Sequence, residues 1–200
     1  MTLTIVLGLA LPFAGTMLGS ACVFFMKRGL NDTVQRFLLG FAGGVMTAAA
    51  VWSLLIPSME AAETSTVFTG RLAFVPALIG FVLGILFLFI LDCITPHLHA
   101  CDHTPEGPRS RLSRTAMLVF AVTLHNIPEG MAVGVLFVGL LSGSGTVTVA
   151  GAFALAIGIA IQNFPEGAII SMPLRTEGNG KLRSFIYGTL SGAVEPVAAV

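Results

Sequence analysis

The chain has 200 residues, of which 55% are hydrophobic and only 10% are charged, and its formal net charge is zero. A soluble domain carries about 25% charged residues, so charge this sparse cannot cover a soluble globule, and lipid is the expected solvent. The zero net charge argues against a nucleic-acid partner, and three cysteines do not make a disulfide framework.

Six apolar segments, each close to the 20 or so residues that cross a bilayer, follow one another along the chain. They predict an all-α, polytopic transmembrane helix bundle that forms one domain over residues 1–200. Residues 1–20 contain no Lys or Arg, so they are interpreted as the first span and not as a cleavable signal peptide. The sixth span is cut at Val200; either a short span ends the protein or, as we favour, the chain is a fragment. The predicted spans are 3–26, 34–56, 72–95, 115–140, 146–172 and 183–200.

The basic residues are distributed unevenly among the connections. Nine of the ten flank the first, third and fifth connections, and only Arg71 lies in the second. Because Lys and Arg accumulate on the cytoplasmic side, this bias predicts that the odd-numbered connections are cytoplasmic and that the N-terminus lies outside.

Glycine pairs at four-residue spacing recur in the predicted spans. Such pairs let helix backbones approach closely in lipid, so they predict tight packing and no particular function. The pairs are Gly15/Gly19, Gly40/Gly44, Gly80/Gly84, Gly130/Gly134 and Gly188/Gly192.

The third connection, residues 96–114, is predicted to be a cytoplasmic loop rich in histidine and cysteine. Short tracts of this kind can bind metal, but the spacing matches no structural zinc module, and a solvated polar loop is an equally good interpretation. Its candidate ligands, weaker than those in the spans, are His97, His99, Cys101 and His103.

One polar motif occurs twice inside the apolar fourth and fifth spans. Carboxylates, an imidazole and amides at membrane depth cost several kcal/mol unless they are paired or ligated, so they are interpreted as functional. Residues four apart share a helix face, and each motif therefore directs its first and fifth side chains the same way. The motifs are His125-Asn126-Ile127-Pro128-Glu129-Gly130 and Gln162-Asn163-Phe164-Pro165-Glu166-Gly167.

The prolines of the motifs predict interrupted helices, because each removes a backbone N–H and disturbs the turn before it. Consecutive spans run in opposite directions, so the two motifs can meet near the midplane. Glu195 lies in the sixth span and is also followed by proline. Three carboxylates, Glu129, Glu166 and Glu195, would then converge and repel one another unless a cation neutralises them.

A divalent metal ion satisfies this arrangement best. One imidazole among carboxylate and amide oxygens suits Zn²⁺, Fe²⁺, Mn²⁺ or Cd²⁺. The predicted ligands are His125, Asn126, Glu129, Gln162, Asn163, Glu166 and Glu195. The residues thus predict a carrier of divalent metal ions and no organic cofactor.

Other functions remain open at this point. An intramembrane metalloenzyme could use the same side chains, although the usual His-Glu-x-x-His signature is missing from the spans. A metal sensor that transports nothing would share the site, and a proton-coupled carrier of another solute would use the carboxylates but leave the amides unexplained. A lone histidine or carboxylate of this kind is often only a hydrogen-bonded packing residue.

At these residues the chain resembles the ZIP (Zrt-, Irt-like) family of divalent metal transporters, and most of all its bacterial branch related to the GufA proteins. The resemblance rests on the two motifs, on Glu195-Pro196 and on Ser53-Leu54-Leu55-Ile56-Pro57. It implies eight spans, two of them beyond Val200, and transport of metal into the cytoplasm by an elevator-like shift of spans one, four, five and six. It also implies a bacterial inner-membrane location, and a homodimer is a possible assembly.

The resemblance further implies a binuclear metal site. The first position matches His125, Glu129, Gln162 and Glu166. The second matches Asn126, Asn163 and Glu195, with Glu129 and Glu166 able to bridge. Relatives often carry Asp or His where this chain has Asn163 and Gln162, and since an amide brings no charge, the second position is expected to bind metal weakly.

Overall fold

The computed structural model describes residues 2–25, 31–96, 108, 111–143 and 147–200. These residues form helices and no β-strand, which confirms the predicted all-α bundle. Five segments are long and apolar enough to cross a membrane, and they agree with the first five predicted spans except that the second continues to Glu63. The five are Leu3–Phe25, Thr33–Glu63, Gly70–Ile94, Ala116–Leu141 and Val149–Thr176.

The helices follow the spans in order. The first span consists of α1 (Thr2–Ser20) and the short α2 (Cys22–Phe25). The second joins α3 (Asp32–Ala49), the π-helical turn η1 (Ala50–Leu55) and α4 (Ile56–Glu63). The 3-10 turn η2 (Gly70–Leu72) precedes α5 (Val75–Ile94), and the next two spans are α6 (Arg114–Leu141) and α7 (Val149–Thr176).

Local sequence explains where several of these helices begin. Asn31, Ser113 and Thr148 precede α3, α6 and α7, and each side-chain oxygen accepts a hydrogen bond from a backbone N–H of the first turn, at 2.8–3.1 Å. Such caps satisfy donors that have no partner inside the helix. The π-turn η1 ends two residues before Pro57, and such local widening is one way in which a membrane helix accommodates the N–H that proline lacks.

The sixth predicted span is divided into two short helices, α8 (Lys181–Gly192) and α9 (Val194–Ala198). The division at Ala193 comes directly before Glu195 and Pro196. Proline at 196 cannot donate to the carbonyl of Gly192, so the helix loses a hydrogen bond at this point. Neither helix alone has the length of a membrane span.

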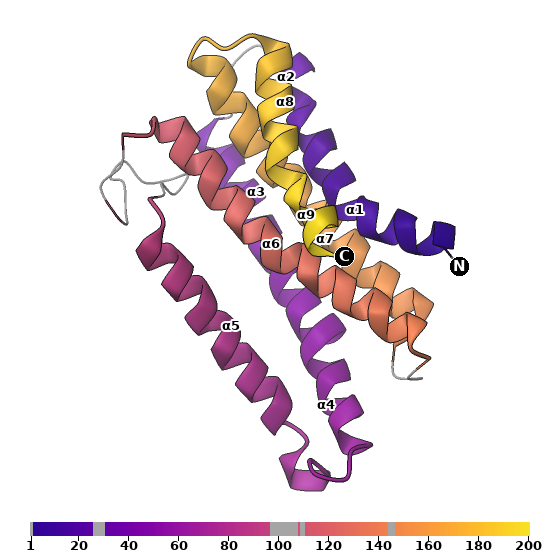
Figure 1. Ribbon diagram of the computed structural model, residues 1–200. Helices are drawn as coiled ribbons and strands as arrows, with labels where there is room; N and C mark the ends of the chain where they lie inside the picture. Colours follow the sequence, from indigo (N-terminus) through magenta and orange to yellow (C-terminus); the bar gives the residue numbers. More distant parts are fainter. Residues whose placement is uncertain (1, 26–30, 97–107, 109–110, 144–146) are drawn as a thin grey trace.

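The helices pack into one tight group and a looser flank (Figure 1). Helices α1, α6, α7, α8 and α9 lie against one another, and α3 packs against α7. Helix α5 stands apart from the bundle, and its main helix contact is with α4. An apolar core between α6 and α7, built from residues such as Val133, Phe137 and Leu155, holds the tight group together.

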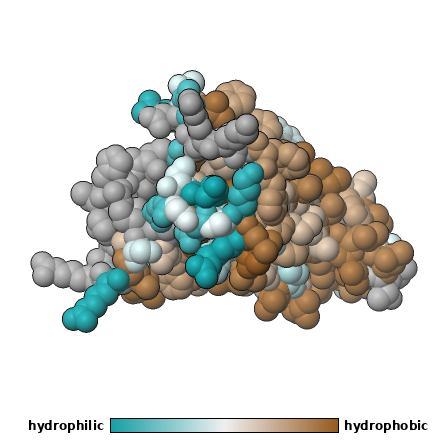
Figure 2. Space-filling view, turned by 90° about the horizontal axis from the view of Figure 1, so that it is seen from above, coloured by the Kyte–Doolittle hydropathy of each residue, from teal (hydrophilic) through white to brown (hydrophobic). Residues whose placement is uncertain are grey.

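Polar surface gathers at one end of the bundle. Seen from above, hydrophilic residues cluster there, while much of the remaining surface in that view is hydrophobic (Figure 2). Arg175, Lys181 and Arg183, which flank the turn from α7 to α8, are exposed, and this turn lies at the upper end in Figure 1. A largely hydrophobic surface with a polar end is what a protein embedded in lipid requires.

Three of the five glycine pairs lie at close contacts between helices, as predicted; two of them meet the backbone of the neighbouring helix, and the third, Gly188/Gly192, meets side chains. A Cβ at Gly15 or Gly19 of α1 would lie 2.1 or 1.9 Å from a carbonyl oxygen of α7, and one at Gly130 would lie 2.3 Å from the carbonyl oxygen of Glu195. The pair Gly188/Gly192 likewise packs α8 against Ser20 and Thr16. The prediction does not hold for Gly40/Gly44 and Gly80/Gly84, which have nothing within 4 Å, because α3 and α5 leave those faces uncovered among the described residues.

Replacing Gly15 by alanine is expected to lower the free energy of unfolding by about 1–3 kcal/mol, because the added methyl group would overlap the carbonyl of Ala160 and force α1 away from α7. Gly44→Ala is the matched control, since open space surrounds Gly44 and alanine favours a helix by about 1 kcal/mol over glycine. Thermal unfolding in detergent, followed by circular dichroism, compares the two variants. Equal midpoints would contradict the close approach of α1 and α7.

Candidate metal centre

The two polar motifs lie on α6 and α7, which face each other in the tight group. The expectation that their prolines interrupt these helices is wrong: Pro128 and Pro165 lie inside continuous helices. Close packing by neighbouring helices compensates the lost hydrogen bond, as it commonly does in membrane helices. The interruption occurs instead in the sixth span, directly before Glu195.

Gln162 joins the two motifs. Its Nε2 donates a hydrogen bond of 2.7 Å to Glu129 Oε2 on α6, and it also donates to Asn163 Oδ1. Both Gln162 and Asn163 are completely buried. In this arrangement the amide presents its NH₂ group to the Glu129 carboxyl oxygen. This polarised NH₂ group thus lies between two oxygen atoms of predicted metal ligands.

Asn126 and Asn163 connect the motifs to the remaining helices. Asn126 Nδ2 donates to the carbonyl oxygen of Ser191 on α8 at 3.1 Å. Asn163 Nδ2 donates to the carbonyl oxygen of Pro12 on α1 at 3.4 Å. The two amides therefore orient their NH₂ groups outward, toward backbone carbonyls of the helices that enclose the site.

Glu195 occupies a fully buried position on α9. Its Oε1 accepts a hydrogen bond of 3.0 Å from the hydroxyl of Thr16, which is also fully buried on α1. Glu129 on α6 is half-buried, and its Oε2 accepts the hydrogen bond from Gln162.

Four of the predicted ligands each carry a buried side-chain oxygen that has no hydrogen-bond partner among the described residues. A buried acceptor left unpaired costs about 1–3 kcal/mol, and more if it is charged. A concentration of such oxygens is unfavourable for the protein alone and favourable for a cation. The atoms are Asn126 Oδ1, Gln162 Oε1, Glu166 Oε2 and Glu195 Oε2.

The remaining predicted ligands are less well placed. His125 lies on α6, one turn from Glu129, and it is exposed. Within the part of the chain that the structure describes, no three His, Cys, Asp or Glu side chains form a group that could hold a metal ion; the donors gathered here include amides. The loop candidates His97, His99, Cys101 and His103 lie outside the described residues.

Sequence reasoning missed the contribution of the first span. Thr16 and the carbonyl of Pro12 contact Glu195 and Asn163, yet neither residue type attracts notice in an apolar helix. The sequence did contain a pattern that could have indicated this contribution: Pro12, Thr16 and Ser20 recur every four residues and so share one helix face.

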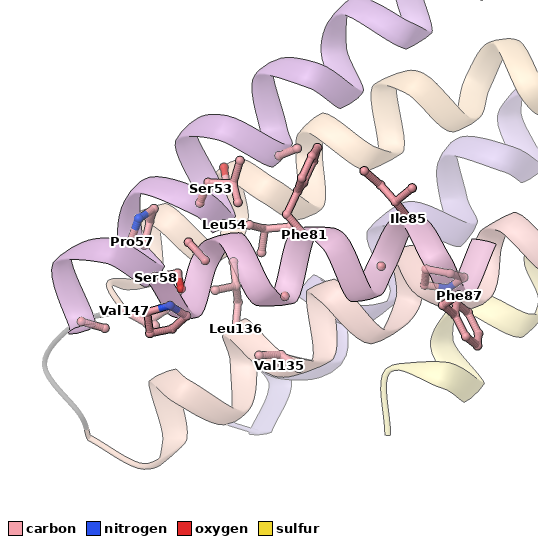
Figure 3. A pocket seen from close by; sticks show the side chains of 18 of the residues that line it. Ser53, Leu54, Pro57, Ser58, Phe81, Ile85, Phe87, Val135, Leu136 and Val147 are labelled. Atoms are coloured by element: carbon pink, nitrogen blue, oxygen red, sulfur yellow. The ribbon is translucent and has the colours of Figure 1, made fainter. Parts of the chain in front are cut away.

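The large apolar cavity in the described structure is distinct from this group (Figure 3). It has a volume of about 590 Å³ and lies between η1, α4, α5 and α6. Ser53, Leu54 and Pro57 of the second span line it, as does Pro128 of the first motif. None of the seven ligands predicted in the spans is among its lining residues, so the metal prediction does not rest on this cavity.

No family model matches the chain. Three of the curated proteins that are similar to it are all named zinc transporters. The chain is 35% identical to the zinc transporter ZIP11 of Homo sapiens, over 97% of the chain and 78% of that protein. It is 36% identical to the zinc transporter ZIPB of Bordetella bronchiseptica, over 98% of the chain and 60% of that protein. It is also 33% identical to the zinc transporter ZupT of Stenotrophomonas maltophilia, over 100% of the chain and 70% of that protein.

Proposed function

The chain belongs to the ZIP family of metal transporters, and from this membership we propose that it carries divalent metal ions, zinc first among them, through the polar group on α6, α7 and α9. The observation that carries the proposal is the set of unpaired buried oxygens on Asn126, Gln162, Glu166 and Glu195. These atoms are acceptors without donors among the described residues, and carboxylate and amide oxygens of this kind are suitable ligands for a cation.

The donor set favours a borderline or hard divalent ion. Carboxylate and amide oxygens predominate, His125 adds a nitrogen one turn from Glu129, and no thiolate lies on these helices. Zn²⁺, Cd²⁺, Fe²⁺ and Mn²⁺ are compatible with such ligands. In this proposal the metal is the transported substrate, and no organic cofactor takes part.

We propose two adjacent metal positions. Glu129 and Glu166 would bridge them, with His125 and Gln162 completing the first, and Asn126, Asn163 and Glu195 completing the second. To serve as a ligand, Gln162 must turn so that its unpaired Oε1, and not its NH₂ group, faces the ion. The entering ion would then replace the NH₂ group as the partner of Glu129.

Asn163→Asp is expected to strengthen metal binding at the second position, because a carboxylate replaces a neutral amide oxygen among the ligands. The variant also loses the donor to the Pro12 carbonyl, so without metal the protein should be less stable than the wild type. Equilibrium binding of ¹⁰⁹Cd²⁺ to the purified protein measures stoichiometry and affinity. Unchanged values would argue against Asn163 as a ligand.

Relative movement of two helix groups is the proposed transport motion. Within the group of α1, α6, α7, α8 and α9, backbones touch directly at glycines. The contact from α7 to α3 is looser: a Cβ at Gly158 would lie 3.9 Å from Ala49 Cβ and 4.0 Å from Val45 Cγ1, which is ordinary van der Waals separation. An elevator-like shift would therefore occur at the surface between α7 and α3.

The direction of transport is proposed to be into the cytoplasm. The basic connections would face the cytoplasm under the positive-inside rule, which places the N-terminus outside and suits a bacterial inner membrane. His97, His99, Cys101 and His103 would then meet ions as they leave, as low-affinity acceptors. A homodimer is the proposed assembly.

Uptake of ⁶⁵Zn²⁺ into proteoliposomes tests the proposed function. The protein should give saturable uptake above that of protein-free vesicles, with competition from Cd²⁺. Glu60→Gln should behave like the wild type, because Glu60 is exposed at the far end of the second span. Tight metal binding without uptake would instead favour a sensor or a metalloenzyme, and hydrolysis of peptides would then be measured.

A further inference from the structure

Thr16 makes a different hydrogen bond from two other threonines within helices, Thr47 and Thr123. A threonine hydroxyl inside a helix commonly returns to the carbonyl four residues back. Thr47 and Thr123 do so, each at 2.8 Å from the carbonyl oxygen, those of Gly43 and Val119. The hydroxyl of Thr16 reaches across to another helix instead, and it donates to Glu195 Oε1 at 3.0 Å.

Glycines on the neighbouring helices leave room for the contact between Thr16 and Glu195. A Cβ at Gly192 would lie 2.7 Å from Thr16 Oγ1 and 2.8 Å from Glu195 Oε1, so any larger residue at 192 would push the two groups apart. On the other side, Gly130 allows α6 to rest on the backbone of Glu195, where a Cβ would lie 2.3 Å from its carbonyl oxygen. Glu195 is thereby fixed between α1, α6 and α8.

The two oxygens of the Glu195 carboxylate have different surroundings. Oε1 accepts the hydrogen bond from Thr16, whereas the buried Oε2 has no partner. A hydrogen bond to one oxygen fixes the rotation of the carboxylate and so determines where the other oxygen lies. Partners of this kind orient metal ligands, and removing one typically weakens metal affinity about 10–100-fold.

We propose that Thr16 is a positioning residue of the metal centre: its hydroxyl holds Glu195 Oε1 so that Oε2 is presented to the metal ion. This inference rests on the proposed function, because it takes Glu195 as a ligand. The proposal makes α1 part of the metal centre. It gives Thr16 a role even though a neutral threonine hydroxyl is not itself a strong metal ligand.

Equilibrium binding of ¹⁰⁹Cd²⁺ to the purified full chain, together with ⁶⁵Zn²⁺ uptake, tests the role of Thr16. Thr16→Val keeps the branched shape and removes the hydroxyl, and it is expected to weaken binding at the Glu195-dependent site by about tenfold or more. Thr16→Ser keeps the hydroxyl and should restore binding. Ser20→Ala is the matched control, because Ser20 is a buried hydroxyl on the same helix face that donates to a backbone carbonyl, that of Gly167, at 3.3 Å.

A double-mutant cycle separates positioning from packing. In a Glu195→Gln background, Thr16→Val should cause no further loss of binding, because its effect acts through the carboxylate. Wild-type affinity in Thr16→Val, equal losses in Thr16→Val and Ser20→Ala, or binding unaffected by Glu195→Gln would each overturn the proposal. If the wild type binds Cd²⁺ but takes up no ⁶⁵Zn²⁺, transport fails as a function while the binding comparison still decides the role of Thr16.

Discussion

Replacement of Glu129 by glutamine is expected to abolish saturable metal uptake while the protein remains folded and inserted. Glu129 is the carboxylate that links the two motifs, because its Oε2 on α6 accepts the hydrogen bond from Gln162 on α7. Glutamine has nearly the same size, and its oxygen can still accept that hydrogen bond. The change therefore removes charge and leaves packing almost intact.

The expected loss is large because the charge is removed where the dielectric constant is low. Attraction between a carboxylate and a divalent ion is many times stronger in such surroundings than in water. Removing a directly bound carboxylate should thus lower metal affinity by more than the roughly 10–100-fold that follows from removing a residue that only orients a ligand. The measurement is ⁶⁵Zn²⁺ uptake by equal amounts of reconstituted protein, with Glu60→Gln as the control for removal of one exposed charge. Near-normal uptake by Glu129→Gln would refute the central role of this residue.

The first five spans could be predicted from hydrophobicity alone, since about 20 apolar residues leave few alternatives to a membrane helix. The sequence was less informative about continuity within helices. Pro128 and Pro165 suggested breaks that neighbouring helices prevent, whereas the division of the sixth span at Ala193 accompanies Pro196. Whether a proline breaks a helix depends on what packs against it, and one helix considered alone does not contain that information.

The candidate site shows the same limit. Glu129, Gln162, Asn163 and Glu195 could be chosen from sequence because polar groups are costly in lipid. Their partners could not, because the hydroxyl of Thr16 and the carbonyl of Pro12 acquire meaning only when α1 packs on α7 and α9. Glycine spacing identified those close contacts correctly for α1 but also suggested them for α3 and α5, where the described structure leaves the glycines uncovered.

A disulfide between α3 and α7 is expected to arrest uptake. In Ala49→Cys/Gly158→Cys the two Cβ atoms would lie 3.9 Å apart, within the range of about 3.5–4.5 Å found in disulfides. The bond should therefore form under mild oxidation without large movement of either helix. Because α7 carries Gln162, Asn163 and Glu166, tying it to α3 would prevent the proposed shift of the metal centre against the second span.

The crosslinking experiment requires a background in which the three native cysteines are replaced by serine. Both single variants and the reduced double variant should take up ⁶⁵Zn²⁺, whereas the oxidised double variant should fall to the level of protein-free vesicles and recover after reduction. Binding of ¹⁰⁹Cd²⁺ should persist in the oxidised form, because the Cβ separation already suits the bond and the ligands need not move to form it. Full uptake by the crosslinked protein would show that α7 does not slide on α3, and lost binding would show that the bond distorts the centre. Only full uptake would require the elevator-like motion to be abandoned at this surface, whereas arrest with binding retained would separate holding the ion from moving it.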